Sequence, residues 1–330
     1  MSQIPAVKRA TRKRRRAIVP IVLGCCPTEP RCVLCAPSEV PENETIAALV
    51  EHYRTERAGP SDRLSVGFFG GMAPTDEMLD SIEGLPFTAR VRPDLLSRAR
   101  ASFLVERGAT GIELDVGTFD DFALRWSGRP YTSGRVMEMA SGLRDLGVRV
   151  GVLLTPGLPG TDFETGIRDA TTATAQFDTA RIQPTLVLVG SRLHHMYEGG
   201  RYTPLTVDNA VAMCREMMDI LEAEGVEVIR VGAQPGPDGM GRLAAGPYHS
   251  SLRELVESQR AQDALRSLIG ELDGDTTSIL IRCASGDETR ARGPANANVR
   301  VFRVEFGLAQ ITVQSDPDFE RGQWAVEKKA

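Results

Sequence analysis

Four of the chain's six cysteines lie within eleven residues, in the segment 25–35, CCPTEPRCVLC. Thiolates are soft ligands that suit zinc ions and iron–sulfur clusters. Cys32 and Cys35 are two residues apart, so one turn of backbone can offer both sulfurs to one metal centre. A third sulfur must come from upstream, from Cys25 or from Cys26. Three thiolates on a four-iron cluster would leave one iron open to an exogenous ligand, which makes this segment a candidate chemical site.

The segments around these cysteines alternate between strands and helices. Apolar runs predict seven strands, at 17–23, 64–69, 87–91, 111–116, 149–154, 182–189 and 226–231. Amphipathic stretches predict helices at 43–57, 75–83, 94–107, 133–146, 162–176 and 207–224. This order calls for a parallel sheet with right-handed crossovers, and seven strands favour a complete or partial (β/α) barrel. In such folds the chemistry lies at the carboxyl ends of the strands, where the cysteine segment falls.

The composition limits the class of protein. The chain has 330 residues, of which 42% are hydrophobic, enough for one large or two smaller domains. No apolar run approaches the ~20 residues that span a bilayer, so we expect no membrane segment. Cysteines clustered as ligands, with Cys214 and Cys283 far apart, favour a reducing compartment over a disulfide framework. We therefore expect a cytoplasmic protein.

A basic arm opens the chain. Residues 8–16, KRATRKRRR, hold seven Lys or Arg, and without them 32 basic residues face 44 acidic ones. We predict that residues 1–16 form a disordered arm. It is either a solvated tail or a segment that binds a polyanion, such as tRNA or another RNA. A secretory signal is disfavoured because the apolar stretch that follows is short and contains Pro20.

The end of the chain differs from the strand–helix repeat. We predict a barrel domain at 17–258 and a C-terminal α+β extension at 259–330, with a helix at 252–270. Strands are expected at 278–282, 299–305 and 309–313. The alternation in VRVFRVEFG, residues 299–307, is typical of an antiparallel strand with one solvated face. The fold expected is therefore α/β, with a small antiparallel β extension that covers an edge of the barrel or caps a substrate.

Seven short motifs, in their usual order, resemble the radical SAM portion of the catalytic subunit of Elongator and its bacterial relatives. They are FFGG at 68–71, RPD at 92–94, ELDVGTFDD at 113–121, GLPG at 157–160, RIQPTLVLVGSRL at 181–193, GGRYTPL at 199–205 and AAGPYHSSLRELVES at 244–258. The resemblance covers roughly residues 17–258. A cysteine cluster after strand one and a Gly-Gly after strand two are also typical of the wider radical SAM superfamily.

The resemblance implies an enzyme with a [4Fe–4S] cluster held by Cys26, Cys32 and Cys35. S-adenosylmethionine (SAM) would chelate the fourth iron, and an external electron donor would drive its cleavage to a 5'-deoxyadenosyl radical that abstracts hydrogen from a substrate. That substrate is unidentified, and tRNA is a candidate by analogy with the family.

The resemblance also implies which residues contact SAM. Gly70 and Gly71 sit where family members present backbone to the methionine amino group, and glycine permits close approach. Glu113 matches the family's strand-four glutamate, and Arg181 takes a place usually held by lysine. Gly157 belongs to the turn that lines the adenosine end of the cofactor.

The sequence departs from the family at several points, among them residues 113–118, which read ELDVGT where family members often have ELGVQS. The gap between Cys26 and Cys32 is longer than the usual superfamily spacing, and residues 129–132 read RPYT where family members have RGHT. About 70 residues follow Ser258, fewer than an acetyltransferase domain needs, so we expect no acetyl-CoA chemistry from this chain.

Two other classes of function stay open. Cys25, Cys26, Cys32 and Cys35 could form a closed zinc or iron–sulfur site that needs no SAM. The basic arm and the altered motifs are also compatible with an RNA-associated scaffold whose site is degenerate. Three residues receive plain structural interpretations: His194-His195 in a surface loop and Cys214 as core packing among methionines.

Overall fold

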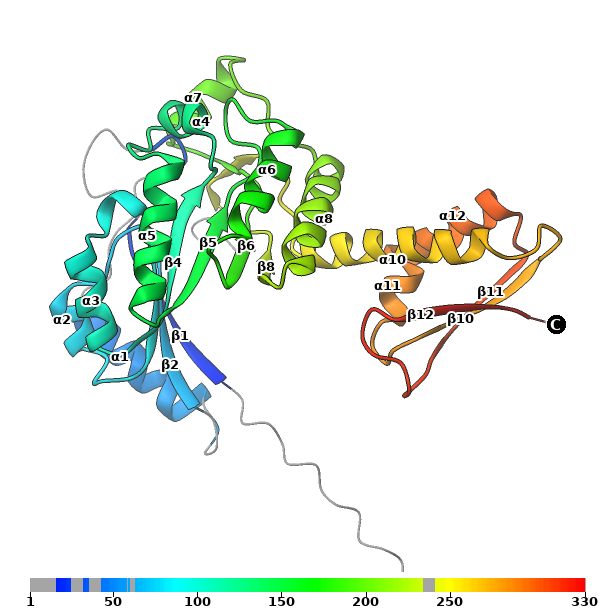
Figure 1. Ribbon diagram of the computed structural model, residues 1–330, viewed down its shortest axis with the longest axis horizontal. Helices are drawn as coiled ribbons and strands as arrows, with labels where there is room; N and C mark the ends of the chain where they lie inside the picture. Colours follow the sequence, from blue (N-terminus) through cyan, green and yellow to red (C-terminus); the bar gives the residue numbers. More distant parts are fainter. Residues whose placement is uncertain are drawn as a thin grey trace, which may run out of the picture. The chain divides into compact units, whose positions relative to one another are not determined.

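The computed structural model describes residues 16–24, 32–35, 43–57, 59, 63–233 and 241–329 (Figure 1). Cys25, Cys26 and residues 1–15 lie outside this set, so the predictions made for them are not tested by the fold. Within the described part, no helix combines the length and the apolar character needed to cross a membrane.

Seven parallel strands form one sheet in the order β1-β2-β3-β4-β5-β6-β8. They are β1 (Arg16–Val22), β2 (Arg63–Phe69), β3 (Phe87–Val91), β4 (Ala109–Gly117), β5 (Arg149–Leu154), β6 (Thr179–Ile182) and β8 (Glu227–Val231). Sequence neighbours pair almost throughout, as repeated right-handed β–α–β units require. β1 and β8 are the two edge strands, so the sheet is a partial barrel, and the predicted fold class is confirmed.

The helices also follow the predicted order. They are α1 (Asn43–His52), α2 (Asp76–Asp80), α3 (Arg98–Glu106), α4 (Asp121–Trp126), α5 (Ser133–Asp145), α6 (Phe163–Ala173), α7 (Arg192–Glu198), α8 (Val207–Ala223) and α10 (Leu252–Gly270). A π-helical turn, Tyr53–Arg57, extends α1, and a 3₁₀ turn, Pro93–Leu95, precedes α3. Sequence reasoning missed α4 and α7.

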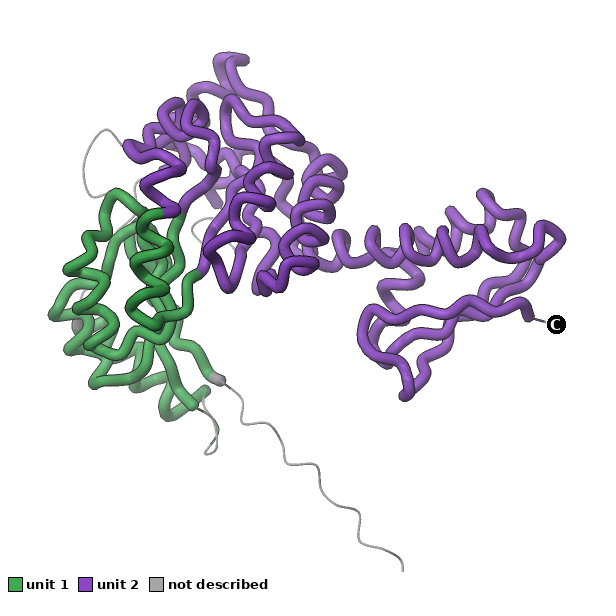
Figure 2. Tube along the Cα trace, in the orientation of Figure 1, with its two compact units in different colours: residues 1–29, 38–115, 138–150 green, residues 30–37, 116–137, 151–330 purple. Residues whose placement is uncertain are grey.

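The chain divides into two compact units (Figure 2). The first comprises residues 1–29, 38–115 and 138–150, and the second comprises residues 30–37, 116–137 and 151–330. The predicted boundary at 258 falls inside α10, and the predicted domain division stays a prediction.

The strand predicted at 182–189 is wrong in its position. The sheet uses β6 instead, which ends at Ile182, and a two-residue strand, β7 (Val187–Leu188), pairs antiparallel with β9 (Leu243–Ala245). Pro184 lies between them and has no N–H to donate to a strand ladder, so the apolar run cannot continue as one central strand.

In the second unit, α6 and α8 pack against each other beside the strands. Gly166 permits the close approach, because a Cβ there would lie 3.0 Å from the sulfur of Met213. Cys214 is fully buried on the same helix, which confirms its core role, and burial raises the pKa of its thiol to about 12.

The C-terminal module contains a second sheet, in the order β11-β10-β12. β10 (Ser278–Cys283) pairs antiparallel with β12 (Trp324–Lys328), as the predicted extension requires, and parallel with β11 (Gln310–Ser315). The short helix α11 (Glu288–Arg292) and the helices α10 and α12 (Ala297–Phe306) complete the module. Its core includes Ile279, Ile281 and Cys283 of β10 and Phe302 of α12.

The strand predicted at 299–305 is wrong, because these residues belong to α12. Val299 and Phe302 are buried whereas Val304 is 87% exposed, a helical pattern that the period-two alternation of apolar residues concealed. Spacings of three and four place Val299, Phe302 and Phe306 on the side that packs against the module's core.

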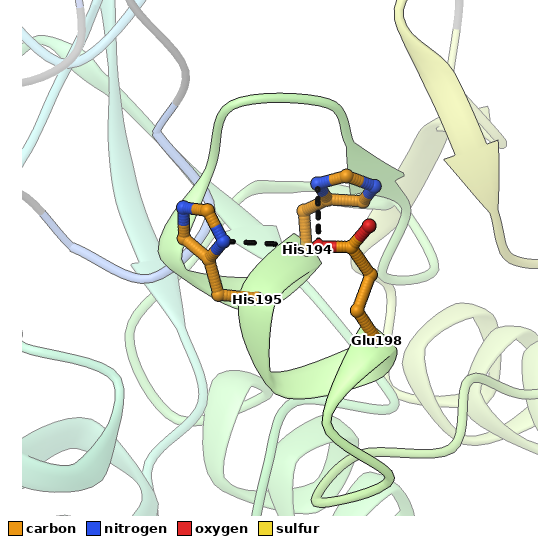
Figure 3. A group of neighbouring side chains, drawn as sticks. All are labelled: His194, His195 and Glu198. Carbon is orange, nitrogen blue, oxygen red and sulfur yellow. Dashed lines mark ion pairs between the residues drawn. The ribbon is translucent and has the colours of Figure 1, made fainter.

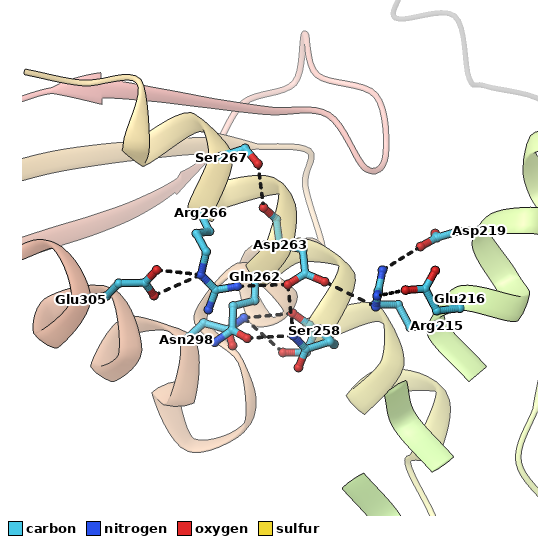
Figure 4. A network of polar contacts seen from close by, with 11 residues as sticks. Arg215, Glu216, Asp219, Ser258, Gln262, Asp263, Arg266, Ser267, Asn298 and Glu305 are labelled. Atoms are coloured by element: carbon cyan, nitrogen blue, oxygen red, sulfur yellow. Dashed lines mark hydrogen bonds and ion pairs between the residues drawn. The ribbon is translucent and has the colours of Figure 1, made fainter. Parts of the chain in front are cut away.

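Polar contacts join α8 to α10 and α10 to α12 within the second unit (Figure 4). Arg215 of α8 lies 3.4 Å from Asp263 of α10, and Arg266 of α10 lies 2.9 Å from Glu305 of α12. The buried Asn298 side chain donates to the carbonyl of Ser258 at 3.1 Å. Within the second unit, α10 is thus tied to α8 through Arg215 and to α12 through Glu305 and Asn298.

Candidate functional site

In the first unit, the ends of β1 and β2 are joined by backbone contacts. The carbonyl of Gly24 accepts hydrogen bonds from the N–H groups of Gly71 and Met72, both at 3.2 Å. Gly70 has φ +144°, and a Cβ there would lie 2.3 Å from the carbonyl oxygen of Leu23. Only glycine fits this position, because a side chain would collide with the backbone that leads into the cysteine segment.

A buried arginine supports the next strand end. The N–H of Arg92 donates to the carbonyl of Gly71 at 2.8 Å. Its guanidinium, 4% exposed, donates two hydrogen bonds to Asp94, at 2.9 and 2.8 Å. A bidentate pair of this kind fixes both side chains. The predicted RPD motif therefore stiffens the connection that follows β3 and supports the turn after β2.

Glu113 forms an ion pair with Arg90 on the neighbouring strand, where the two residues are direct partners in the β3–β4 register. Both side chains are largely buried, at 13% and 15% exposure. The Arg90 guanidinium also lies over the Phe69 ring, 5.5 Å from its centroid. The strand-four glutamate thus has a protein cation beside it, which holds its carboxylate in place.

In the second unit, Cys32 and Cys35 bracket a tight turn. The N–H of Cys35 donates to the carbonyl of Cys32 at 3.1 Å, and the two sulfurs lie 3.0 Å apart. This separation exceeds the S–S bond of about 2.05 Å, so the two sulfurs are not bonded to each other. Both peptide groups of Val33 are anchored: its N–H donates to the carbonyl of Ser127 and its carbonyl accepts from Leu193, each at 2.9 Å.

The side chain of Val33 extends this anchor into a small apolar cluster with Val187, Leu193 and Tyr202. The Tyr202 hydroxyl donates to the carbonyl of Gly157 at 2.7 Å, and burial raises the pKa of that phenol. The cysteine turn and the turn after β5 therefore rest on one cluster.

Gly157 itself has φ +85°, and a Cβ there would lie 2.9 Å from the Leu205 side chain. The positive φ favours glycine here, and the Cβ of any other residue would displace the Leu205 side chain. The N–H and the hydroxyl of Thr185 both donate to the carbonyl of Pro156, at 2.9 and 3.0 Å. The predicted GLPG turn is thus held by Thr185 at Pro156 and by Tyr202 at Gly157.

A buried carboxylate that sequence reasoning missed organises the loop after β4. Asp169 of α6 is 4% exposed and accepts hydrogen bonds from the Thr118 hydroxyl at 3.0 Å and the Phe119 N–H at 2.7 Å. Burial raises its pKa from 3.8 to about 7, against the lowering effect of these two hydrogen bonds. The sequence did hold a signal, since Asp169 lies on the small-residue face of α6 with Gly166 and Ala170.

The altered RPYT motif lies at the same strand end. Arg129 is 2% exposed and donates to the Tyr131 hydroxyl at 2.7 Å, and that hydroxyl donates to the carbonyl of Val116 at 3.1 Å. Gly117, with φ +83°, leaves room for the guanidinium, which a Cβ would approach to 3.4 Å. The motif thus forms part of the scaffold behind the loop after β4.

The predicted site residues fall into the two units. Gly70, Gly71 and Glu113 belong to the first, and Cys32, Cys35, Gly157 and Arg181 belong to the second. Arg181 lies on β6, half-buried, and its register partners are Leu153 of β5 and Arg230 of β8. The histidine pair lies on α7 rather than in a loop, so that expectation is wrong.

Comparison with known proteins gives three results. The Radical SAM C-terminal domain family matches residues 177–262. The tRNA uridine(34) acetyltransferase of Methanocaldococcus jannaschii is 30% identical over 124 residues, 36% of this chain and 23% of that protein. Elongator complex protein 3 of Drosophila melanogaster is 27% identical over 174 residues, 51% of this chain and 31% of that protein. The chain thus matches less than a third of either relative's length.

The archaeal Elp3 of Methanocaldococcus infernus, solved without its N-terminus, has a similar fold. The TM-score is 0.62 at 19% sequence identity, and the similarity covers 77% of this chain and 64% of that one. The partial barrel and the sequence matches agree with the motifs that indicated the same relationship. Over part of its length the chain is therefore similar to Elongator-like proteins of the radical SAM superfamily.

Proposed function

We propose that this chain is a radical SAM enzyme in which Cys26, Cys32 and Cys35 hold a [4Fe–4S] cluster. The observation that carries the proposal is the turn from Cys32 to Cys35, whose sulfurs lie 3.0 Å apart. Soft thiolates presented together by one turn suit an iron–sulfur cluster. The hydrogen bonds of both peptide groups of Val33 support the proposal, because they hold the turn that carries the two proposed ligands.

The bound cluster would supply the reductive cleavage of SAM to a 5'-deoxyadenosyl radical, with one electron from an external donor. The chain's own residues would bind and orient the cofactors. Gly70 and Gly71 present backbone without side chains, the Glu113 carboxylate is paired with Arg90, and Gly157 lets the turn after β5 pack closely against Leu205. Arg181 supplies a positive charge on β6.

The substrate class proposed is RNA, with tRNA as the first candidate. Its support is the similarity to a tRNA uridine(34) acetyltransferase and the seven positive charges of residues 8–16. An arm of this kind neutralises phosphates without reading sequence. A cytoplasmic location is proposed with it, where both tRNA and a reducing environment are present.

Anaerobic reconstitution with iron and sulfide tests the proposal. The full chain should take up close to four iron atoms, and SAM should change its spectrum and be cleaved to 5'-deoxyadenosine. The variants Cys26→Ala, Cys32→Ala and Cys35→Ala should lose iron and cleavage. Cys25→Ala should retain both, and Cys214→Ala serves as a cysteine control because it lies in the α8 core.

Two outcomes would contradict the assignment. Retained cleavage in Cys26→Ala, together with its loss in Cys25→Ala, would exchange the first ligand. Zinc bound by all four clustered cysteines, with no effect of SAM, would instead favour a closed structural site.

A further inference from the structure

Three side chains of α7 form a cluster that the proposed chemistry does not use: His194, His195 and Glu198 (Figure 3). Nδ1 of His194 lies 3.7 Å and Nδ1 of His195 lies 3.8 Å from the same oxygen, Oε2 of Glu198. Glu198 follows the two histidines by four and three positions, so one side of the helix brings the three groups together. One ligand atom from each lies within 4.8 Å of the others.

These distances fit a metal site better than a simple hydrogen-bonded pair. An N–H···O hydrogen bond spans about 2.7–3.2 Å, and both separations are longer. Metal–nitrogen and metal–oxygen bonds of about 2.0–2.2 Å place tetrahedral ligands about 3.4 Å apart. Small side-chain rotations would therefore bring both imidazoles and the carboxylate onto one ion. Two imidazoles with one carboxylate are a donor set for zinc and similar divalent ions.

The helix that carries the cluster is fixed at its first turn. The Ser191 hydroxyl accepts from the N–H of His194 at 3.1 Å, and the N–H of Leu193 donates to the cysteine turn at Val33. The His194 side chain is 17% exposed, so the backbone and this ligand are already placed. His195 and Glu198 are 70% and 59% exposed, which leaves an open path from solvent.

We propose that His194, His195 and Glu198 bind one divalent cation of the zinc class, with water in the remaining position. This site is separate from the cysteine ligands. The ion would connect the first and last turns of α7, the helix on which the cysteine turn rests. Binding should therefore stabilise α7 locally as well as occupy the three side chains.

Zinc counting on the full chain tests the site. After anaerobic cluster assembly, equilibrium dialysis against Zn²⁺ should give one bound zinc per chain. His195→Ala and Glu198→Gln should each weaken this zinc at least about ten-fold. His52→Ala is the matched control, because it removes an exposed histidine on α1 and should leave the zinc unchanged.

Cobalt distinguishes the site from zinc bound by stray thiolates. Co²⁺ in the histidine site should show ligand-field bands without thiolate charge transfer, and Cys32→Ala/Cys35→Ala should retain it. An unchanged zinc count in both His195→Ala and Glu198→Gln would overturn the proposal, as would a cobalt spectrum made only of thiolate bands. The result is independent of SAM cleavage, so it does not depend on the proposed function.

Discussion

Gly70→Ala should damage the end of β1 more than an ordinary glycine substitution damages a loop. The new Cβ would lie 2.3 Å from the carbonyl oxygen and 2.8 Å from the carbonyl carbon of Leu23, and neither atom belongs to a flexible side chain. A φ of +144° adds backbone strain of about 1–3 kcal/mol. Forcing the two backbones apart adds about 1–3 kcal/mol. We expect the free energy of unfolding to fall by about 2–6 kcal/mol.

Gly84→Ala is the matched control for this variant. Gly84 also has a positive φ, +73°, but a Cβ there meets nothing within 4 Å and the residue is exposed. It should lose only about 1–2 kcal/mol, the cost of a left-handed backbone. Urea denaturation followed by circular dichroism compares the two proteins, and iron content after reconstitution reports on the cysteine segment. Equal denaturation midpoints for the two variants would refute the steric argument.

Three further predictions concern charged groups. Burial raises the pKa of Asp169 from 3.8 to about 7, so its stabilising contribution is complete below pH 4 and is lost as the pH rises through 7. Between pH 4 and pH 8 the urea midpoint of the wild type should therefore fall relative to that of Asp169→Asn. Parallel pH profiles of the two proteins would contradict this. Glu113→Gln should cost about 1–3 kcal/mol in urea denaturation, because the guanidinium of Arg90 loses its charged partner, and the double variant with Arg90→Gln should cost less than the sum of the single ones. Deletion of residues 1–15 should lower tRNA affinity and weaken the dependence of that affinity on salt, while uncoupled SAM cleavage stays unchanged. If tRNA binding by the full chain does not vary with salt, the arm is only a solvated tail.

The sequence predicted the sheet well because its signals there are local. The strands at 87–91 and 149–154 and the helix at 252–270 have the predicted bounds, since each apolar run ends at glycine, proline or polar residues. The errors arise where the apolar residues fit both a strand period and a helix period, or where proline interrupts an apolar run. Val304 fits the alternation of a strand, yet in α12 it is solvent-exposed. Pro184 divides an apolar run that looked continuous, and the part beyond it pairs with β9.

What the sequence could not predict is which backbone groups hold the candidate ligands. The spacing of Cys32 and Cys35 predicts a shared metal centre, but the anchors of Val33 come from Ser127 and Leu193, far along the chain. The resemblance assigns the Gly-Gly motif to cofactor contact. The structure shows a second reason for glycine at position 70, because the backbone of Leu23 lies too close for a side chain.

These two findings alter how losses of activity should be interpreted. A substitution at Gly70 can abolish the proposed SAM cleavage by displacing Leu23 and Gly24, which precede the cysteine segment, without any direct contact to SAM. A substitution at Leu193 or Tyr202 can do the same from the other end, because the cluster with Val33 supports the turn that carries two of the three proposed ligands. Only variants that keep their iron and their unfolding midpoint, and still lose cleavage, identify residues that contact the cofactor. Glu113 and Arg181 are the first residues on which to apply that criterion.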